Sequence, residues 1–155
     1  MNKTDFLTKL KKEGKIGIVE PSEEIRQSYT EKSESNLLSA KILLENDKLE
    51  ESVSLAYYSM YHSLTSLLFK TGIKSENHSA SIILLKEIFG IDNSGILFAK
   101  RERVDKQYYV NFRITKEQVK DVIRKAEMFN SRMIDFISRM TNEDMGLYRK
   151  KFREI

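Results

Sequence analysis

The sequence predicts an all-α protein, an antiparallel up-and-down bundle of about five helices. Its 155 residues include one proline and six glycines, too few for a β fold with many turns. Apolar residues recur at three- and four-residue spacing through most of the chain, and we identify no convincing strand. Residues 49–72 are apolar on two sides, which is typical of a helix buried between neighbours.

Residues 49–72 form the predicted central helix, and Gly72 is placed to end it. One apolar face and a stripe of small residues follow helical spacing along this segment. The opposite side carries Leu55, Tyr58, His62 and Phe69. This second face contacts either another helix of the same chain or a partner chain, and the sequence leaves both open.

The segment before the central helix divides into three parts. Residues 4–12 have the pattern of a short amphipathic helix, and the glycines and the single proline of 14–21 indicate a connector. Ser22 is a plausible N-cap for a helix that continues to about Asn46. We therefore expect residues 1–21 to precede a helical bundle that begins at residue 22.

Three helices are predicted after the central one. A short apolar helix covers 82–89, a less regular one covers 94–110, and a long one covers 116–140. Thr115 and Gln118 have the spacing of a capping box at the start of the long helix. The bundle then comprises residues 22–140, and 141–155 form a basic C-terminal extension, a weaker helix or a frayed tail.

Composition excludes several classes of protein. The chain has no cysteine and only two histidines, so we expect no disulfide, no metal site and no cofactor. It also lacks a glycine-rich phosphate loop and an apolar run of the roughly 18 residues that a membrane span needs. The N-terminus does not resemble a secretion signal. These features predict a soluble, cytoplasmic protein with no membrane contact.

Positive charge gathers in the window 100–113 and again in the C-terminal tail. Such clusters are usually solvated faces, although they can hold phosphates. Residues 101–109 present arginines and tyrosines together, and arginine grips phosphate while tyrosine stacks on bases. On its own this pattern is a weak indication of a nucleic-acid site.

The run AYYSMYH at 56–62, followed by Leu67-Leu68, Gly72, His78 and the segment ending Gln107-Tyr108-Tyr109, resembles the HEPN family. The resemblance covers roughly residues 14–140. It implies a helical bundle that pairs into homodimers, often beside a nucleotidyltransferase in toxin–antitoxin-like modules. Other members are metal-independent ribonucleases whose Arg-x(4–6)-His motif is assembled across the dimer interface.

The chain departs from that motif because no histidine follows Arg101 or Arg103, and Tyr108 occupies the matching spacing. Arg101 and Tyr108 share a helix face, so we prefer this pairing. Tyrosine is a poor general base at neutral pH compared with histidine, which predicts weak nuclease activity. The catalytic candidates are Arg101, Arg103 and Tyr108. The binding candidates are Tyr58, His62, His78, Asp105 and Tyr109, although a histidine such as His62 is more often a hydrogen-bonded structural residue.

Three functional hypotheses follow. The first is a HEPN-type homodimer that partners a nucleotidyltransferase in a toxin–antitoxin-like or nucleotide-related module, with weak or no nuclease activity. The second is a divergent metal-independent endoribonuclease that uses Arg101, Arg103 and Tyr108 with help from His62 or His78. The third is a nucleotide- or RNA-binding module without chemistry.

Overall fold

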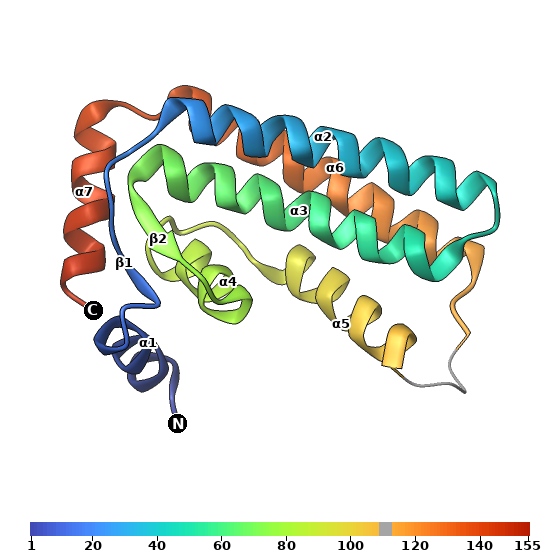
Figure 1. Cartoon of the computed structure of the whole chain (residues 1–155), viewed down its shortest axis with the longest axis horizontal. Coiled ribbons are helices and arrows are strands. Elements are labelled where there is room, and N and C mark those ends of the chain that lie inside the picture. The colour runs from blue at the N-terminus through green and yellow to red at the C-terminus, as the bar shows by residue number, and fades with distance from the viewer. Residues whose placement is uncertain (109–112) are drawn as a thin grey trace.

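The long helices of the protein lie side by side and form the body of a bundle (Figure 1). The computed structural model describes the backbone of residues 1–108 and 113–155 and the side chains of 1–103 and 113–155. Within these residues there are seven helices and one two-stranded sheet, which confirms the all-α class. The elements are α1 (Lys3–Lys12), β1 (Ile16–Ile18), α2 (Glu23–Glu45), α3 (Leu49–Thr71), β2 (Ile73–Ser75), α4 (His78–Glu87), α5 (Ser94–Tyr108), α6 (Lys116–Arg139) and α7 (Asn142–Arg153).

Helix α3 is the centre of the bundle, as its two apolar sides predict. It packs against α2, α5 and α6 along its length (Figure 1). Its predicted core face is buried, including Val53, Met60 and Leu64, which are at most 1% exposed. The second face is only partly buried, including Leu55 and Tyr58. The half-exposed surface that remains on α3 is the setting of the candidate site.

The small residues of α3 allow α2 to approach closely and bond to it. Ser52 Oγ donates to the carbonyl of Ala40 at 2.6 Å, and Ser66 Oγ donates to the carbonyl of Arg26 at 3.0 Å. Between them, Ser59 Oγ donates to the carbonyl of Ser33 at 2.7 Å. Because each of these hydroxyls donates to a backbone carbonyl of α2, it is buried with its hydrogen bond satisfied.

The helix boundaries follow the predicted caps. Ser22 accepts a hydrogen bond from the amide of Ile25, and Thr115 and Gln118 form the reciprocal capping box. Gly72 ends α3 in the left-handed conformation, with φ of 84°. All three predictions are confirmed, because each depends on local chemistry within four residues.

The prediction that the chain contains no strand is wrong. Ile16–Ile18 pairs antiparallel with Ile73–Ser75, and Ile18 lies opposite Ile73. Each strand has three residues, too short to show the alternation by which strands are recognised. The pair ties the N-terminal connector to the end of α3 and thereby fixes one wall of the pocket discussed below.

The C-terminal segment is an ordered helix rather than a frayed tail. Thr141 and Asp144 form a capping box at the start of α7, and Phe152 near its end is buried. Lys11 Nζ on α1 donates to the carbonyls of Phe152, Arg153 and Ile155 at the end of α7. A positive charge at this position stabilises the helix, because the C-terminal end of a helix dipole is negative. None of the described helices has the length and apolar content that crossing a bilayer requires.

Candidate functional site

Three helices bring aromatic and basic side chains together at one place. Helix α3 supplies Tyr57, Tyr58 and Tyr61. Tyr61 is one helical turn beyond the other two, so the three side chains lie within about 100° of one another around the helix. His78 is the first residue of α4, directly after the N-cap Asn77. Helix α5 supplies Lys100 and Arg103, which are one helical turn apart. We call Tyr57, Tyr58, His78, Lys100 and Arg103 the basic cluster.

Arg103 lies over two tyrosine rings of α3. Its guanidinium carbon is 5.6 Å from the ring centre of Tyr57 and 5.0 Å from that of Tyr58, within cation–π range. Nη2 donates to the hydroxyl of Tyr58 at 3.1 Å, and the buried Nε has no hydrogen-bond partner among the described residues. A guanidinium has five donor hydrogens, and the bond to Tyr58 uses one of them.

His78 is held between two tyrosines. Its Nδ1 shares a hydrogen bond of 2.9 Å with the hydroxyl of Tyr57, and its ring stacks on Tyr61 with centres 3.7 Å apart. Burial lowers the pKa of His78, and the positive charges of Lys100 and Arg103 lower it further. The imidazole is therefore mostly neutral at neutral pH, and no hydrogen-bond partner of Nε2 is found among the described residues.

Lys100 completes a concentration of positive charge. Its Nζ donates to Ser79 Oγ at 2.7 Å, next to His78 in the chain. Burial lowers the pKa of Lys100, and Arg103 adds a smaller repulsion. Among the described side chains, no carboxylate forms an ion pair with Lys100 or Arg103. An anion bound here would relieve the mutual repulsion of these groups.

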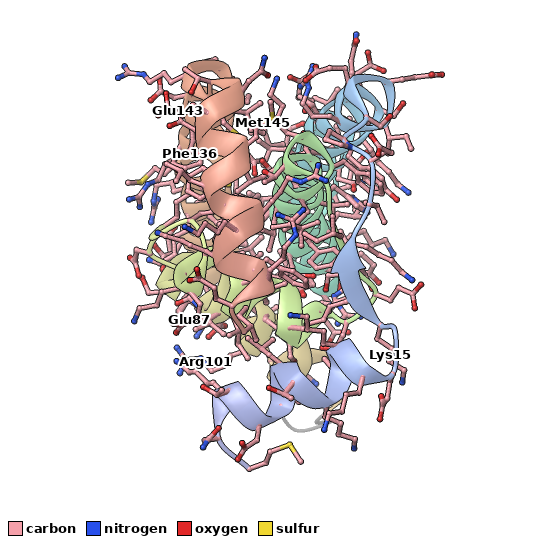
Figure 2. All side chains as sticks on the ribbon, turned by 90° about the vertical axis from the view of Figure 1, so that its left-hand side faces the viewer. Lys15, Glu87, Arg101, Phe136, Glu143 and Met145 are labelled. Carbon is pink, nitrogen blue, oxygen red and sulfur yellow. The ribbon has the colours of Figure 1, made fainter. Side chains whose placement is uncertain are left out.

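The structure joins some of the predicted site residues and separates others. It brings Tyr58, His78 and Arg103 together. Arg101, two residues before Arg103, is exposed and projects from the edge of the molecule (Figure 2). The side chains of Asp105 and Tyr108, and the whole of Tyr109, lie outside the described residues.

Lys100 and Tyr57 belong to the basic cluster and Tyr61 stacks on its His78, although none of the three is a site residue predicted from the sequence. The spacing of Lys100 and Arg103 was a usable signal, because residues three apart on a helix share a face. The helical spacing of Tyr57 and Tyr61 is typical of core residues, and both are indeed mostly buried. No group of three or more acidic, histidine or cysteine side chains among the described residues is placed to hold a metal ion.

His62 lies one helical turn from Tyr58 but is bonded to a different helix. Its Nδ1 is 2.8 Å from Oδ1 of Asn36 on α2, so Nδ1 carries the hydrogen and donates. Its ring lies 6.0 Å from that of Tyr58, centre to centre. Burial lowers the pKa of His62 from 6.5 to about 4, with smaller effects from Lys32 and His78. The ring is thus neutral near pH 7, as a structural histidine or a hydrogen-bond acceptor would be.

The low pKa of His62 predicts a loss of stability in mild acid. The unfolded chain binds a proton near pH 6.5 and the folded chain only near 4, so stability falls as pH is lowered through this window. A fully buried shift of this size equals roughly 3 kcal/mol, and we expect about 1–2 kcal/mol because water reaches part of the ring. Urea unfolding at pH 7 and pH 4.5 measures the loss. His62→Gln should lose less over this interval, and an equal loss in both proteins would contradict the assignment.

Comparison with known proteins identifies relatives. The profile of the HEPN domain matches residues 26–135, which span α2 to most of α6. "UPF0332 protein PH1297" of Pyrococcus horikoshii is 42% identical over 83 residues, which are 52% of this chain and 53% of that protein. The match therefore spans about half the length of this relative.

Two further relatives match over more of their length. "Putative toxin MJ0605" of Methanocaldococcus jannaschii is 31% identical over 114 residues, covering 69% of this chain and 84% of that protein. A "UPF0332 protein" of Thermotoga maritima is 30% identical over 116 residues, covering 69% of this chain and 86% of the relative. The residues matched by the HEPN profile, 26–135, include α3, α4 and α5, on which the basic cluster is built.

Proposed function

This chain belongs to the HEPN domain family, and from that premise we propose that it is a toxin-like protein that binds RNA or nucleotide phosphate at the basic cluster. We further propose that it forms a homodimer and works with a nucleotidyltransferase-family partner. In this proposal the isolated protein has weak nuclease activity or none, because Tyr108 stands where the family's ribonucleases carry a histidine.

The convergence of Lys100, Arg103 and His78 carries this proposal. Two cations and a neutral imidazole meet beside aromatic rings, and no described carboxylate forms an ion pair with either cation. Arginine binds phosphate oxygens in a bidentate manner, and lysine adds a point charge. Tyr57 and Tyr58 hold the guanidinium in place by cation–π contact, so the donors of Arg103 are oriented before a ligand arrives.

The proposed partners rest on the family and on the second face of α3. Leu55 and Tyr58 of this face are only partly buried in the single chain, so surface remains for a second copy or another protein. Light scattering over a wide range of concentration tests the homodimer, and a monomer throughout would contradict it. Co-purification with a nucleotidyltransferase encoded beside this gene tests the partner.

Metal-independent RNA cleavage is the second candidate, favoured by the neutral His78 beside Arg103. In this reaction a base removes the proton of a 2′-hydroxyl, the 2′-oxygen bonds to phosphorus, and the bond to the 5′-oxygen breaks as that oxygen gains a proton. The products are a 2′,3′-cyclic phosphate and a 5′-hydroxyl. Nε2 of His78 can take the proton when Nδ1–H donates to Tyr57, and Arg103 can neutralise the phosphate.

Binding of a fluorescein-labelled single-stranded RNA in EDTA, followed by anisotropy, tests the proposal. Each phosphate contact to a single strand contributes about −0.7 to the slope of log affinity against log salt concentration. With Lys100 and Arg103 each contacting one phosphate, we expect a slope of about −1.4. Binding that is absent or insensitive to salt would contradict the phosphate site. Cyclic-phosphate products in the same samples would favour the ribonuclease over the weakly active protein.

The same assay has a predicted pH dependence. A bound phosphate raises the pKa of His78 by opposing the burial and repulsion that lower it, so binding takes up a proton. Affinity should therefore rise as pH is lowered from 8 to 6. His78→Asn removes the titrating group and should flatten this profile. An unchanged profile in His78→Asn would exclude His78 from the site.

A further inference from the structure

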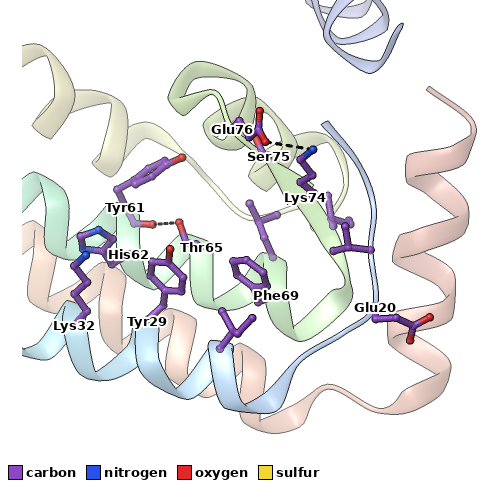
Figure 3. A pocket seen from close by; sticks show the side chains of 14 residues that line it. Glu20, Tyr29, Lys32, Tyr61, His62, Thr65, Phe69, Lys74, Ser75 and Glu76 are labelled. Atoms are coloured by element: carbon purple, nitrogen blue, oxygen red, sulfur yellow. Dashed lines mark hydrogen bonds and ion pairs between the residues drawn. The ribbon is translucent and has the colours of Figure 1, made fainter. Parts of the chain in front are cut away.

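A pocket lies beside the basic cluster, between α2, α3 and β2 (Figure 3). It has a volume of about 670 Å³, within the usual range for pockets that bind small molecules. Tyr29 of α2 and His62, Thr65 and Phe69 of α3 form its walls. The pocket is open to solvent on one side, so a group carried on a longer chain could enter it.

Four flat rings line this pocket: Tyr29, Tyr61, His62 and Phe69. The rings of Tyr29 and Phe69 are nearly parallel, with an angle of 8° and centres 5.6 Å apart. The His62 ring continues the row at 5.7 Å from Tyr29. Planar aromatic ligands gain stacking energy on such surfaces, and nucleobases stack regardless of their sequence.

The polar groups of the pocket suit an uncharged ligand. Asn36 holds Nδ1–H of His62, so Nε2 of the neutral ring is a hydrogen-bond acceptor, and no donor to it is found among the described residues. At the rim, Lys32 and Lys74 are balanced by Glu20 and Glu76, and Lys74 pairs with Glu76 at 3.2 Å. A rim whose charges balance does not select a phosphate, whereas Nε2 of His62 can receive an amino hydrogen of a base.

Tyr61 connects the pocket to the basic cluster. It lines the pocket, and its other side stacks on His78 at 3.7 Å. Its hydroxyl is 3.3 Å from Ser81 Oγ, which donates to Ser75 in the pocket wall. His62 also lines the pocket and stacks beside Tyr58, the tyrosine that receives the hydrogen bond from Arg103. A phosphate at the cluster and a base in the pocket would thus be neighbours.

We propose that the pocket of Tyr29, His62, Thr65 and Phe69 binds a nucleobase, while the adjoining basic cluster binds the phosphate attached to it. The inference deepens the proposed function, on which it rests, and it specifies the ligand. A base enters this pocket only when it is unpaired, so the RNA form recognised is single-stranded. A free nucleotide carries the same two groups and is the other source of such a ligand.

Filling the pocket is the most direct test. Thr65→Phe adds a ring inside it, whereas Thr8→Phe adds the same ring on α1 and removes an equivalent hydroxyl bond to the carbonyl four residues earlier. The probe is a single-stranded oligoribonucleotide with one 2-aminopurine, whose fluorescence falls when the base stacks. We expect Thr65→Phe to weaken binding about tenfold and to abolish the quenching, because one stacked base contributes on this scale. Thr8→Phe should stay within about twofold of the wild type on the same scale.

Two additions keep the result interpretable. Tyr29→Leu removes a stacking ring from a half-exposed position and should weaken binding about fivefold. This variant tests the pocket even if Thr65→Phe does not fold. Adenosine and uridine monophosphates, titrated alone, show whether a free nucleotide suffices or a strand is needed. Circular dichroism confirms that each variant is folded.

The outcomes separate this inference from the proposed function. If RNA binds in a salt-dependent manner but Thr65→Phe and Tyr29→Leu bind as the wild type does, the pocket inference is overturned and the phosphate site stands. If neither RNA nor a mononucleotide binds, both are overturned. If a mononucleotide binds in a Thr65-dependent manner and RNA does not, the pocket stands and the RNA assignment fails. Equal losses in Thr65→Phe and Thr8→Phe would also overturn the pocket.

Discussion

Replacing Arg103 by glutamine should lower the affinity for single-stranded RNA by roughly 30- to 100-fold. A hydrogen bond to a charged group contributes about 1.5–3 kcal/mol, and Arg103 offers several such donors to a phosphate. The substitution also removes the cation that lies over Tyr57 and Tyr58. Anisotropy at constant ionic strength measures the loss, and the salt dependence should become shallower by one phosphate contact.

Arg101→Gln is the matched control, because it removes the same charge from the same helix. Arg101 is exposed and lies outside the basic cluster, so only general attraction to RNA is lost. We expect an effect below about threefold at physiological salt, where exposed charges are well screened. Equal losses in the two variants would mean that RNA is attracted to α5 in general and that Arg103 has no special geometry. A larger loss in Arg101→Gln would favour the pairing of Arg101 with Tyr108.

The Arg103 variant should fold normally. Nε of Arg103 is buried without a partner among the described residues, and this cost offsets part of the stabilisation from its contacts with Tyr57 and Tyr58. Thermal unfolding within a few degrees of the wild type would separate a binding defect from a folding defect. The comparison is cleaner than a substitution at Tyr57, which is fully buried and shares its hydroxyl with His78.

The central helix and its caps could be predicted from sequence because they depend on residues close together in the chain. The apolar spacing of α3, the N-cap Ser22 and the C-terminal Gly72 each appear as predicted. The long helix α6 likewise begins at the capping box of Thr115. In each case the relevant contacts lie within one or two helical turns.

The site could not be assembled in this way because its parts come from three separate helices. Nothing in the spacing of His78 and Arg103 reveals that both contact Tyr57. Helical geometry does place Arg101 and Arg103 on different faces, since they are about 200° apart. The sequence alone does not show which of these faces α3 covers. The structure places Arg103 against α3 and leaves Arg101 exposed.

The ends of the chain were difficult for a related reason. Strand β1 is only three residues long and is defined by its pairing with β2. In the sequence, α2 and α3 lie between the two strands. Helix α7 is secured by the burial of Phe152 and by Lys11 of α1, which caps its end. These contacts join distant parts of the chain, so a local pattern could not distinguish an ordered helix from a frayed tail.

Replacing Gly72 by alanine should destabilise the protein by about 3 kcal/mol. The left-handed backbone costs an alanine roughly 1–2 kcal/mol, and the added Cβ meets a further obstacle. It would lie 2.5 Å from the carbonyl oxygen of Val19 and 3.1 Å from Cδ of Pro21. The backbone of Val19 cannot retreat freely, because its amide donates to the carbonyl of Gly72 at 2.9 Å. Urea unfolding at pH 7 measures the change.

Gly90→Ala is the control that separates these two costs. Gly90 also has a positive φ, of 66°, but no atom lies within 4 Å of the position that a Cβ would take. It should therefore lose only the conformational part, about 1 kcal/mol. A difference of about 2 kcal/mol between the variants would measure the close approach of the N-terminal connector to the end of α3. Equal losses would mean that the connector shifts without cost, and the β1–β2 wall of the nucleobase pocket would then be looser than its hydrogen bonds indicate.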